Sequence, residues 1–148
     1  MVRIGQKLFL VALLGVSSCI VACAPPPQAP EIRHLTVSAK PPMPWPSALV
    51  AKPDAAPQIL RVWLSRRDLV PGGSIDGKIA TSTNVASLEV RTVVFSINAL
   101  RSDFGQFHFH LHILDVPGIS RGRSYQMQII ARNTAGVENV QTTNLEMP

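Results

Sequence analysis

The stretch FHFHLHI (residues 107–113) alternates large apolar side chains with imidazoles. The apolar set is Phe107, Phe109, Leu111 and Ile113, and the imidazoles belong to His108, His110 and His112. Because successive side chains of a β-strand point to opposite faces of its sheet, this alternation predicts a strand with one buried face and one solvated face. The predicted strand places the three histidines together on the solvated side, where a functional site is accessible.

This row of histidines has three interpretations. Neighbouring rings lie roughly 6.5–7 Å apart along the strand and can share one zinc or copper ion, whereas the first and third are about 13 Å apart. A complete metal site therefore needs a ligand from another strand, for which Glu89 and His34 are the candidates. Alternatively, protonation of the row near pH 6 alters a partner-binding face. In the third interpretation, which we favour, the histidines are ordinary polar residues of a solvated strand.

Short runs of β-branched and aromatic residues fill residues 58–148, separated by Gly, Pro and Asn turns and without helical periodicity. The expected strands are residues 59–65, 74–82, 88–98, 107–113, 124–133 and 137–145. Residues 88–98 change the face of their apolar set midway, which predicts a bulge or kink near Arg91 and Thr92. Six or seven short strands in a segment of this size predict an all-β fold, a single antiparallel β-sandwich.

Residues 118–136, GISRGRSYQMQIIARNTAG, resemble the end of a fibronectin type III or bacterial immunoglobulin-like domain, as does Pro71-Gly72-Gly73 before an expected strand. The resemblance implies that Tyr125 puts its ring into the core and bonds its hydroxyl to nearby backbone, and that Gly136 shapes a hairpin. The second expected strand lacks the tryptophan usual in fibronectin type III cores, and Trp63 of the first strand is the candidate replacement. Domains of these families bind proteins, glycans or neighbouring domains and are rarely catalytic.

The N-terminus carries an export signal. Arg3 and Lys7 precede the apolar run LFLVALLGV (8–16), which is too short to span a bilayer comfortably. The tetrapeptide Ile20-Val21-Ala22-Cys23 follows and resembles a bacterial lipobox. The resemblance implies a signal peptide over residues 1–22, acylation of Cys23 and, from Ala24, sorting to the outer membrane. The alternative is a plain secretory signal with a chance cysteine.

Residues 23–57 are expected to form a tether between the lipid and the domain. Ten of the thirteen prolines lie here, which favours extended polyproline II. At about 3.1 Å per residue such a tether reaches on the order of 100 Å. Trp45, within PPMPWPS (41–47), either docks into a partner's groove or folds back onto the chain's own domain, and we favour the second. Whether IRHLTV (32–37) forms a strand or docks on the domain is open.

Composition narrows the function further. Both cysteines lie in the signal region, so residues 58–148 contain no thiol nucleophile and no disulfide. The sequence has no phosphate-binding glycine loop and no HExxH, so we expect a non-enzymatic protein. Without Arg3 and Lys7 of the signal, 12 basic and 9 acidic residues leave a net charge of +3, which is mild for nucleic-acid binding. The sequence therefore predicts an envelope lipoprotein whose domain (58–148) binds a protein or glycan, with Trp45, Arg121 and Arg123 as candidate contacts.

Overall fold

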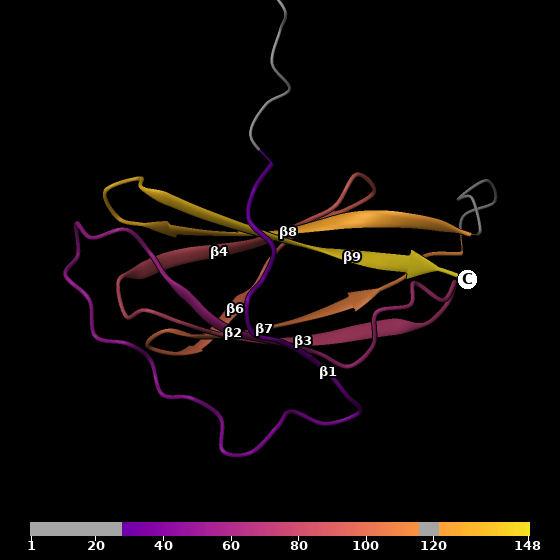
Figure 1. Cartoon of the computed structure of the whole chain (residues 1–148), viewed down its shortest axis with the longest axis horizontal. Helices are drawn as coiled ribbons and strands as arrows, with labels where there is room; N and C mark the ends of the chain where they lie inside the picture. The colour runs from indigo at the N-terminus through magenta and orange to yellow at the C-terminus, as the bar shows by residue number, and fades with distance from the viewer. Residues whose placement is uncertain (1–27, 116–121) are drawn as a thin grey trace, which may run out of the picture.

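The computed structural model describes residues 28–115 and 122–148, and within these residues the chain forms strands and no helix. Two sheets face each other in Figure 1, one with strand order β1-β2-β3-β7-β6 and the other with order β5-β4-β8-β9. The strands are β1 (Leu35–Val37), β2 (Ile59–Leu64), β3 (Ser74–Thr81), β4 (Val85–Arg91), β5 (Ser96–Asn98), β6 (Leu100–Asp103), β7 (Gln106–His112), β8 (Arg123–Asn133) and β9 (Glu138–Met147). Every neighbouring pair is antiparallel except β1 with β2. The all-β prediction is confirmed, and the two facing sheets agree with the predicted sandwich.

The alternation in β7 places its residues as predicted. The apolar members face the opposite sheet and are buried: Phe107, Phe109, Leu111 and Ile113. The histidines between them are exposed on the outer face of the sheet: His108, His110 and His112. Burying four large apolar side chains from one strand contributes roughly 1.5–3 kcal/mol for each, which fixes the strand's register against its neighbours.

The second sheet supplies the other half of the core through β8. Its inward residues Met127, Ile129 and Ala131 are at most 1% exposed, and Tyr125 packs against the same cluster. The turn from β8 into β9 contains Gly136 at a φ of +81°, a conformation that glycine adopts without a Cβ penalty. The turn before Tyr125, where the backbone partner of its hydroxyl was expected, includes residues 116–121, which lie outside the described residues.

Residues 88–98 form two strands and not one bent strand, so the predicted bulge near Arg91 and Thr92 is wrong. The chain reverses between β4 and β5, where Thr92 Oγ1 accepts hydrogen bonds from the backbone of Val94 and Phe95. Val93 is 82% exposed at this turn. The change of phase in the apolar pattern therefore marks a hairpin.

Trp63 does not occupy the core between the sheets. Its neighbours in β2, Val62 and Leu64, belong to the core cluster, whereas Trp63 lies opposite Lys78 on the outer face. The side chain is nevertheless only 7% exposed, because β1 lies beside it and Ser38 accepts a hydrogen bond from its indole nitrogen. Trp63 therefore does not replace the core tryptophan of fibronectin type III domains.

Residues 28–57, here named the strap, lie against the two sheets. Figure 1 shows this segment crossing from the β8-β9 layer to β1 and continuing around the other layer. Ile32 is 7% exposed and belongs to the core cluster, where it closes the side of the sandwich between β9 and β2. IRHLTV therefore both docks on the domain and forms a short strand.

Candidate binding surface

The row of histidines on β7 faces polar residues of β3. His108 lies opposite Lys78, His110 opposite Asp76 and His112 opposite Ser74. The Nδ1 atom of His110 is 2.7 Å from Oδ1 of Asp76, and both side chains are more than half exposed. Because a contact between two exposed polar side chains contributes little to stability, this contact aligns the two side chains without holding the fold together.

The described residues contain no group of three His, Cys, Asp or Glu side chains placed to hold one metal ion. The two extra ligands considered from the sequence lie elsewhere. Glu89 belongs to β4 of the opposite sheet. His34 precedes β1, which is separated from β7 by β2 and β3, and three strand spacings amount to about 14 Å. His110 and Asp76 thus offer two ligands, whereas a zinc site needs three or four protein ligands.

Trp45 folds back onto the outer face of this same sheet. Its indole nitrogen donates a hydrogen bond to Oε1 of Gln106 at 2.8 Å, and Nε2 of Gln106 donates to the carbonyl of Pro46 at 3.1 Å. The ammonium group of Lys78 lies 5.0 Å from the centre of the indole ring, within the range of a cation–π contact. Of the two interpretations of Trp45, the contacts agree with the fold-back that we favoured.

A hollow of about 420 Å³ lies beside Trp45. It is lined by Trp45, Pro46, Ser47, Ala48, Lys78, Ser102, Asp103, Phe104 and Gln106. The lining combines two aromatic side chains with hydroxyl, amide, ammonium and carboxylate groups. Such a mixture suits a ligand that has both apolar faces and hydrogen-bonding groups, as peptides and sugars do.

Phe104 stands at the tip of the hairpin between β6 and β7 and is 70% exposed. It also lines a second hollow on the side of the β3–β4 turn, together with Ala51, Pro53, Thr83, Asn84, Val85, Ala86, Arg101 and Thr134. Leu100, at the start of β6, is 65% exposed. Leu100 in β6 and Phe104 in the turn after it are therefore both presented to solvent, and Phe104 lines both hollows.

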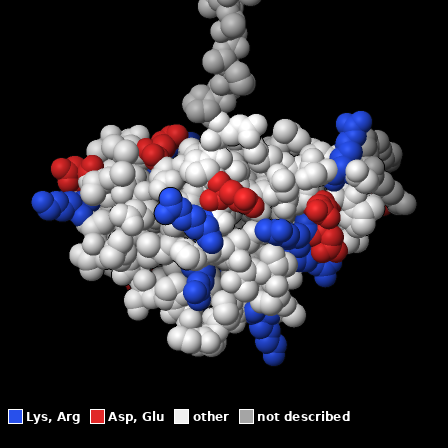
Figure 2. Space-filling model, in the orientation of Figure 1, with Lys and Arg blue, Asp and Glu red and all other residues white. Residues whose placement is uncertain are grey.

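The two arginines proposed as contacts are not part of this surface. Arg121 lies outside the described residues. Arg123 begins β8 and lines a different hollow with Asp68 and Glu146. Because β7 runs from the hairpin at Phe104 toward the segment that precedes β8, Arg123 lies at the other end of the sandwich. On the face shown in Figure 2 the basic side chains are scattered, and several lie beside acidic ones.

A cluster that the sequence analysis missed lies on the outer face of the second sheet. Glu89 is 8% exposed. Its carboxylate oxygen Oε1 accepts hydrogen bonds from Ser96 Oγ at 2.6 Å and from Arg91 Nε at 2.8 Å. Its other oxygen accepts from Arg132 Nη1 at 2.8 Å. The hydrogen bond from Ser96, followed by that from Arg132, lowers the pKa of Glu89 to about 2. Because the carboxylate is fully paired, the cluster is suited to holding β4, β5 and β8 together.

No protein-family model matches the sequence, and no curated protein is significantly similar to it. Within residues 28–115 and 122–148 there is also no helix with the length and hydrophobicity required to cross a membrane.

Proposed function

We propose that this chain is a bacterial envelope lipoprotein, acylated at Cys23, that presents an immunoglobulin-like β-sandwich as a non-enzymatic binding module for a protein or glycan. The lipobox-like tetrapeptide after the apolar run supports the anchor. Acylation of the cysteine thiol and of the new amino terminus gives more than one acyl chain, which is enough for stable membrane attachment. The alanine after the cysteine favours the outer membrane.

The strand order supports the immunoglobulin-like assignment. In such domains strands A, B, E and D form one sheet and C, F and G the other, with C′ added beside C in the variable type. β2, β3, β7 and β6 follow the first order, and β5, β4, β8 and β9 follow the second with C′ included. The inward position of Tyr125 at the start of the strand equivalent to F is a second point of agreement.

The observation that carries the binding proposal is the exposure of Phe104, which lines two hollows. Aromatic residues dominate the binding energy of many interfaces, so an exposed phenylalanine that lines two hollows is a candidate contact. Of the described residues that line the hollow at Trp45, one carries a carboxylate. A binding role therefore suits this hollow better than catalysis by a pair of acids.

Lipidation is tested by growing cells that express the full chain with an alkyne-tagged fatty acid. The wild type should incorporate the label and sediment with membranes, whereas the Cys23→Ser variant should do neither. An unmodified Cys23 in the mature wild-type protein would disprove the anchor.

The binding surface is tested by a photo-crosslinking residue introduced at position 104 in intact cells. A protein partner should give a discrete adduct at position 104 and none from the control position Asn144, which is exposed on β9. A glycan partner should instead be retained by the purified wild type and lost with Phe104→Ala. If neither a protein adduct nor glycan retention depends on position 104, the proposed surface is wrong.

A further inference from the structure

The beginning of the strap is bonded to β9. The backbone nitrogen of Thr142 donates to the carbonyl of Pro30 at 2.9 Å, and its carbonyl accepts from the nitrogen of Ile32 at 2.9 Å. The hydroxyl of Thr142 adds a hydrogen bond to the carbonyl of Ala29 at 3.2 Å. With the side chain of Ile32 in the core, the chain is attached to the domain from residue 29 onward.

The rest of the strap is attached as well. β1 pairs with β2 over three residues, and Trp45 is hydrogen-bonded to Gln106. The carbonyl of Leu49 accepts from the backbone of Thr83 at 2.8 Å. Three asparagine amides then donate to strap carbonyls: Asn84 to Lys52 and Ala55, Asn133 to Ala55, and Asn139 to Pro57. Contacts spread over this length leave little of the strap to act as a free spacer.

The length of chain available as a spacer is therefore short. Seven residue steps separate Cys23 from Pro30, and a fully extended chain covers at most about 3.3–3.6 Å in each step, which gives roughly 25 Å. The whole of residues 23–57 would have reached on the order of 100 Å if it were extended.

We propose that the strap shortens the connection to the lipid, so that the domain is held within about 25 Å of the bilayer with its β9 side toward the membrane. This inference rests on the proposed acylation of Cys23. The β6 edge then faces away from the membrane, because β9 and β1 are joined by the strap on one side of the sandwich while β5 and β6 are the last strands on the other.

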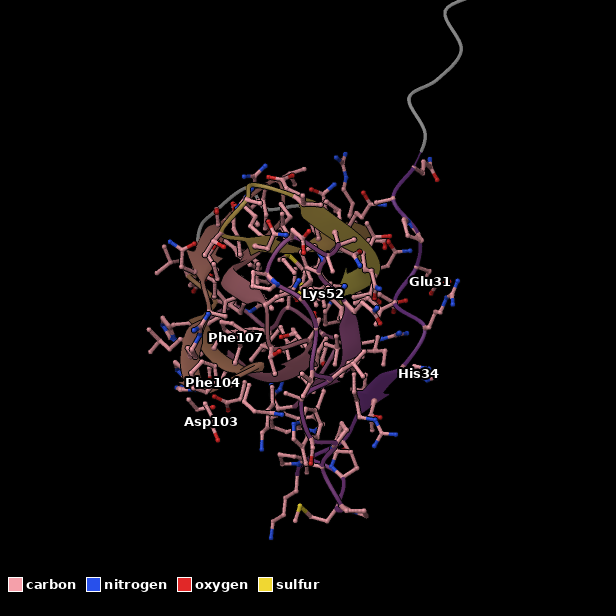
Figure 3. The ribbon with its side chains drawn as sticks, turned by 90° about the vertical axis from the view of Figure 1, so that its left-hand side faces the viewer. Glu31, His34, Lys52, Asp103, Phe104 and Phe107 are labelled. Carbon is pink, nitrogen blue, oxygen red and sulfur yellow. The ribbon has the colours of Figure 1, made fainter. Side chains whose placement is uncertain are left out.

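Figure 3 shows the two sides of the domain. Glu31 and His34, in the strap, lie on one side of the domain, and Asp103 and Phe104 lie on the opposite side. A domain of this size is roughly 35 Å across. A partner that binds at Phe104 therefore contacts the side of the domain that lies away from the lipid anchor at Cys23.

Energy transfer from single labelled cysteines to acceptor lipids tests the proposal in the purified lipidated protein, reconstituted into vesicles. The chain has no cysteine besides Cys19, in the signal, and Cys23, so Arg33→Cys and Ser102→Cys each give one labelling site. Both positions are exposed. We expect strong energy transfer from a label at position 33 and much weaker transfer from a label at position 102.

The matched control inserts about twenty Gly and Ser residues between Pro27 and Gln28, which adds roughly 25 Å of mean reach without altering the strap. This insertion should remove most of the transfer from position 33. The short connection is overturned if positions 33 and 102 show equal energy transfer, or if the insertion leaves the transfer from position 33 unchanged. Either result is decisive once mass spectrometry shows that Cys23 is acylated. An unacylated Cys23 overturns the proposed anchor instead.

Discussion

The ring of Phe109 covers Gly77 on the adjacent strand, and a Cβ atom built on that glycine would come within 2.0 Å of Cε1 of the ring. Both residues lie on the inner face of the sheet, and Phe109 is 4% exposed. Contact this close is possible because glycine has no side chain, so the packing of Phe109 depends on the residue at position 77.

Gly77→Ala should therefore destabilise the protein by roughly 1–3 kcal/mol, the usual range for overpacking a core. Denaturant unfolding of the full-length chain measures the change. The double variant Gly77→Ala/Phe109→Leu should lose less unfolding free energy than the sum of the two single variants, because the smaller leucine leaves room for the added Cβ atom. Purely additive effects would contradict the proposed contact.

Ile32→Ala should destabilise the domain by about 2–5 kcal/mol, as other large-to-small substitutions in cores do. The reason is that Ile32 fills the open side of the sandwich although it precedes the first long strand. Val37→Ala is the matched control, since Val37 is 41% exposed in the same segment. Equal effects of the two substitutions on the unfolding midpoint would show that the strap is not part of the core.

Acid should weaken the protein through Glu89. Its pKa is lowered to about 2 in the folded state, whereas an unfolded glutamate titrates near 4.3. The stabilisation from its ionised form is therefore complete above about pH 5 and disappears as the pH falls toward 2. Glu89→Gln should lower the free energy of unfolding at pH 7 by roughly 1–3 kcal/mol. Thermal unfolding at a series of pH values should also show that the stability of this variant falls less steeply in acid. Glu138→Gln, at a more exposed carboxylate, should change the acid limb little.

Zinc should bind the domain weakly. His110 and Asp76 supply two ligands, and the described residues group no third one with them. Calorimetric titration of the wild type should give no stoichiometric sub-micromolar binding, and Asp76→Asn should behave like the wild type. Tight binding that is lost in His110→Ala would instead favour a metal-binding protein.

Local patterns predicted the parts of the fold whose signal repeats every two residues. In β7 and β8 the alternating side chains could be assigned to the core or to solvent because each position follows from its neighbour. The same rule missed β6, whose four residues are all exposed on the last strand of the sheet. It also misread residues 88–98, because a change of phase is produced equally by a bulge and by a tight hairpin.

The candidate binding surface was predicted in part. Trp45 was identified because a tryptophan among prolines is unusual, but its neighbours in space, Gln106 and Lys78, come from strands far along the chain. Phe104 gave no signal in the sequence, because a single phenylalanine in a turn does not reveal whether it is buried. Glu89 was considered only as a metal ligand, and its pairing with Arg132 gave no signal because the two residues are 43 positions apart.

The sequence by itself determined the all-β class of the domain and the solvated position of the histidines, because alternation and turn residues act over a few neighbouring positions. The predicted export signal is likewise a linear feature, because it depends on consecutive residues at the N-terminus. Only the tertiary structure decided that the proline-rich segment is bound to the domain and that it lines two hollows together with the exposed Phe104. Those outcomes depend on contacts such as Ile32 with Thr142, and the free energy of such contacts exists only once distant strands have come together.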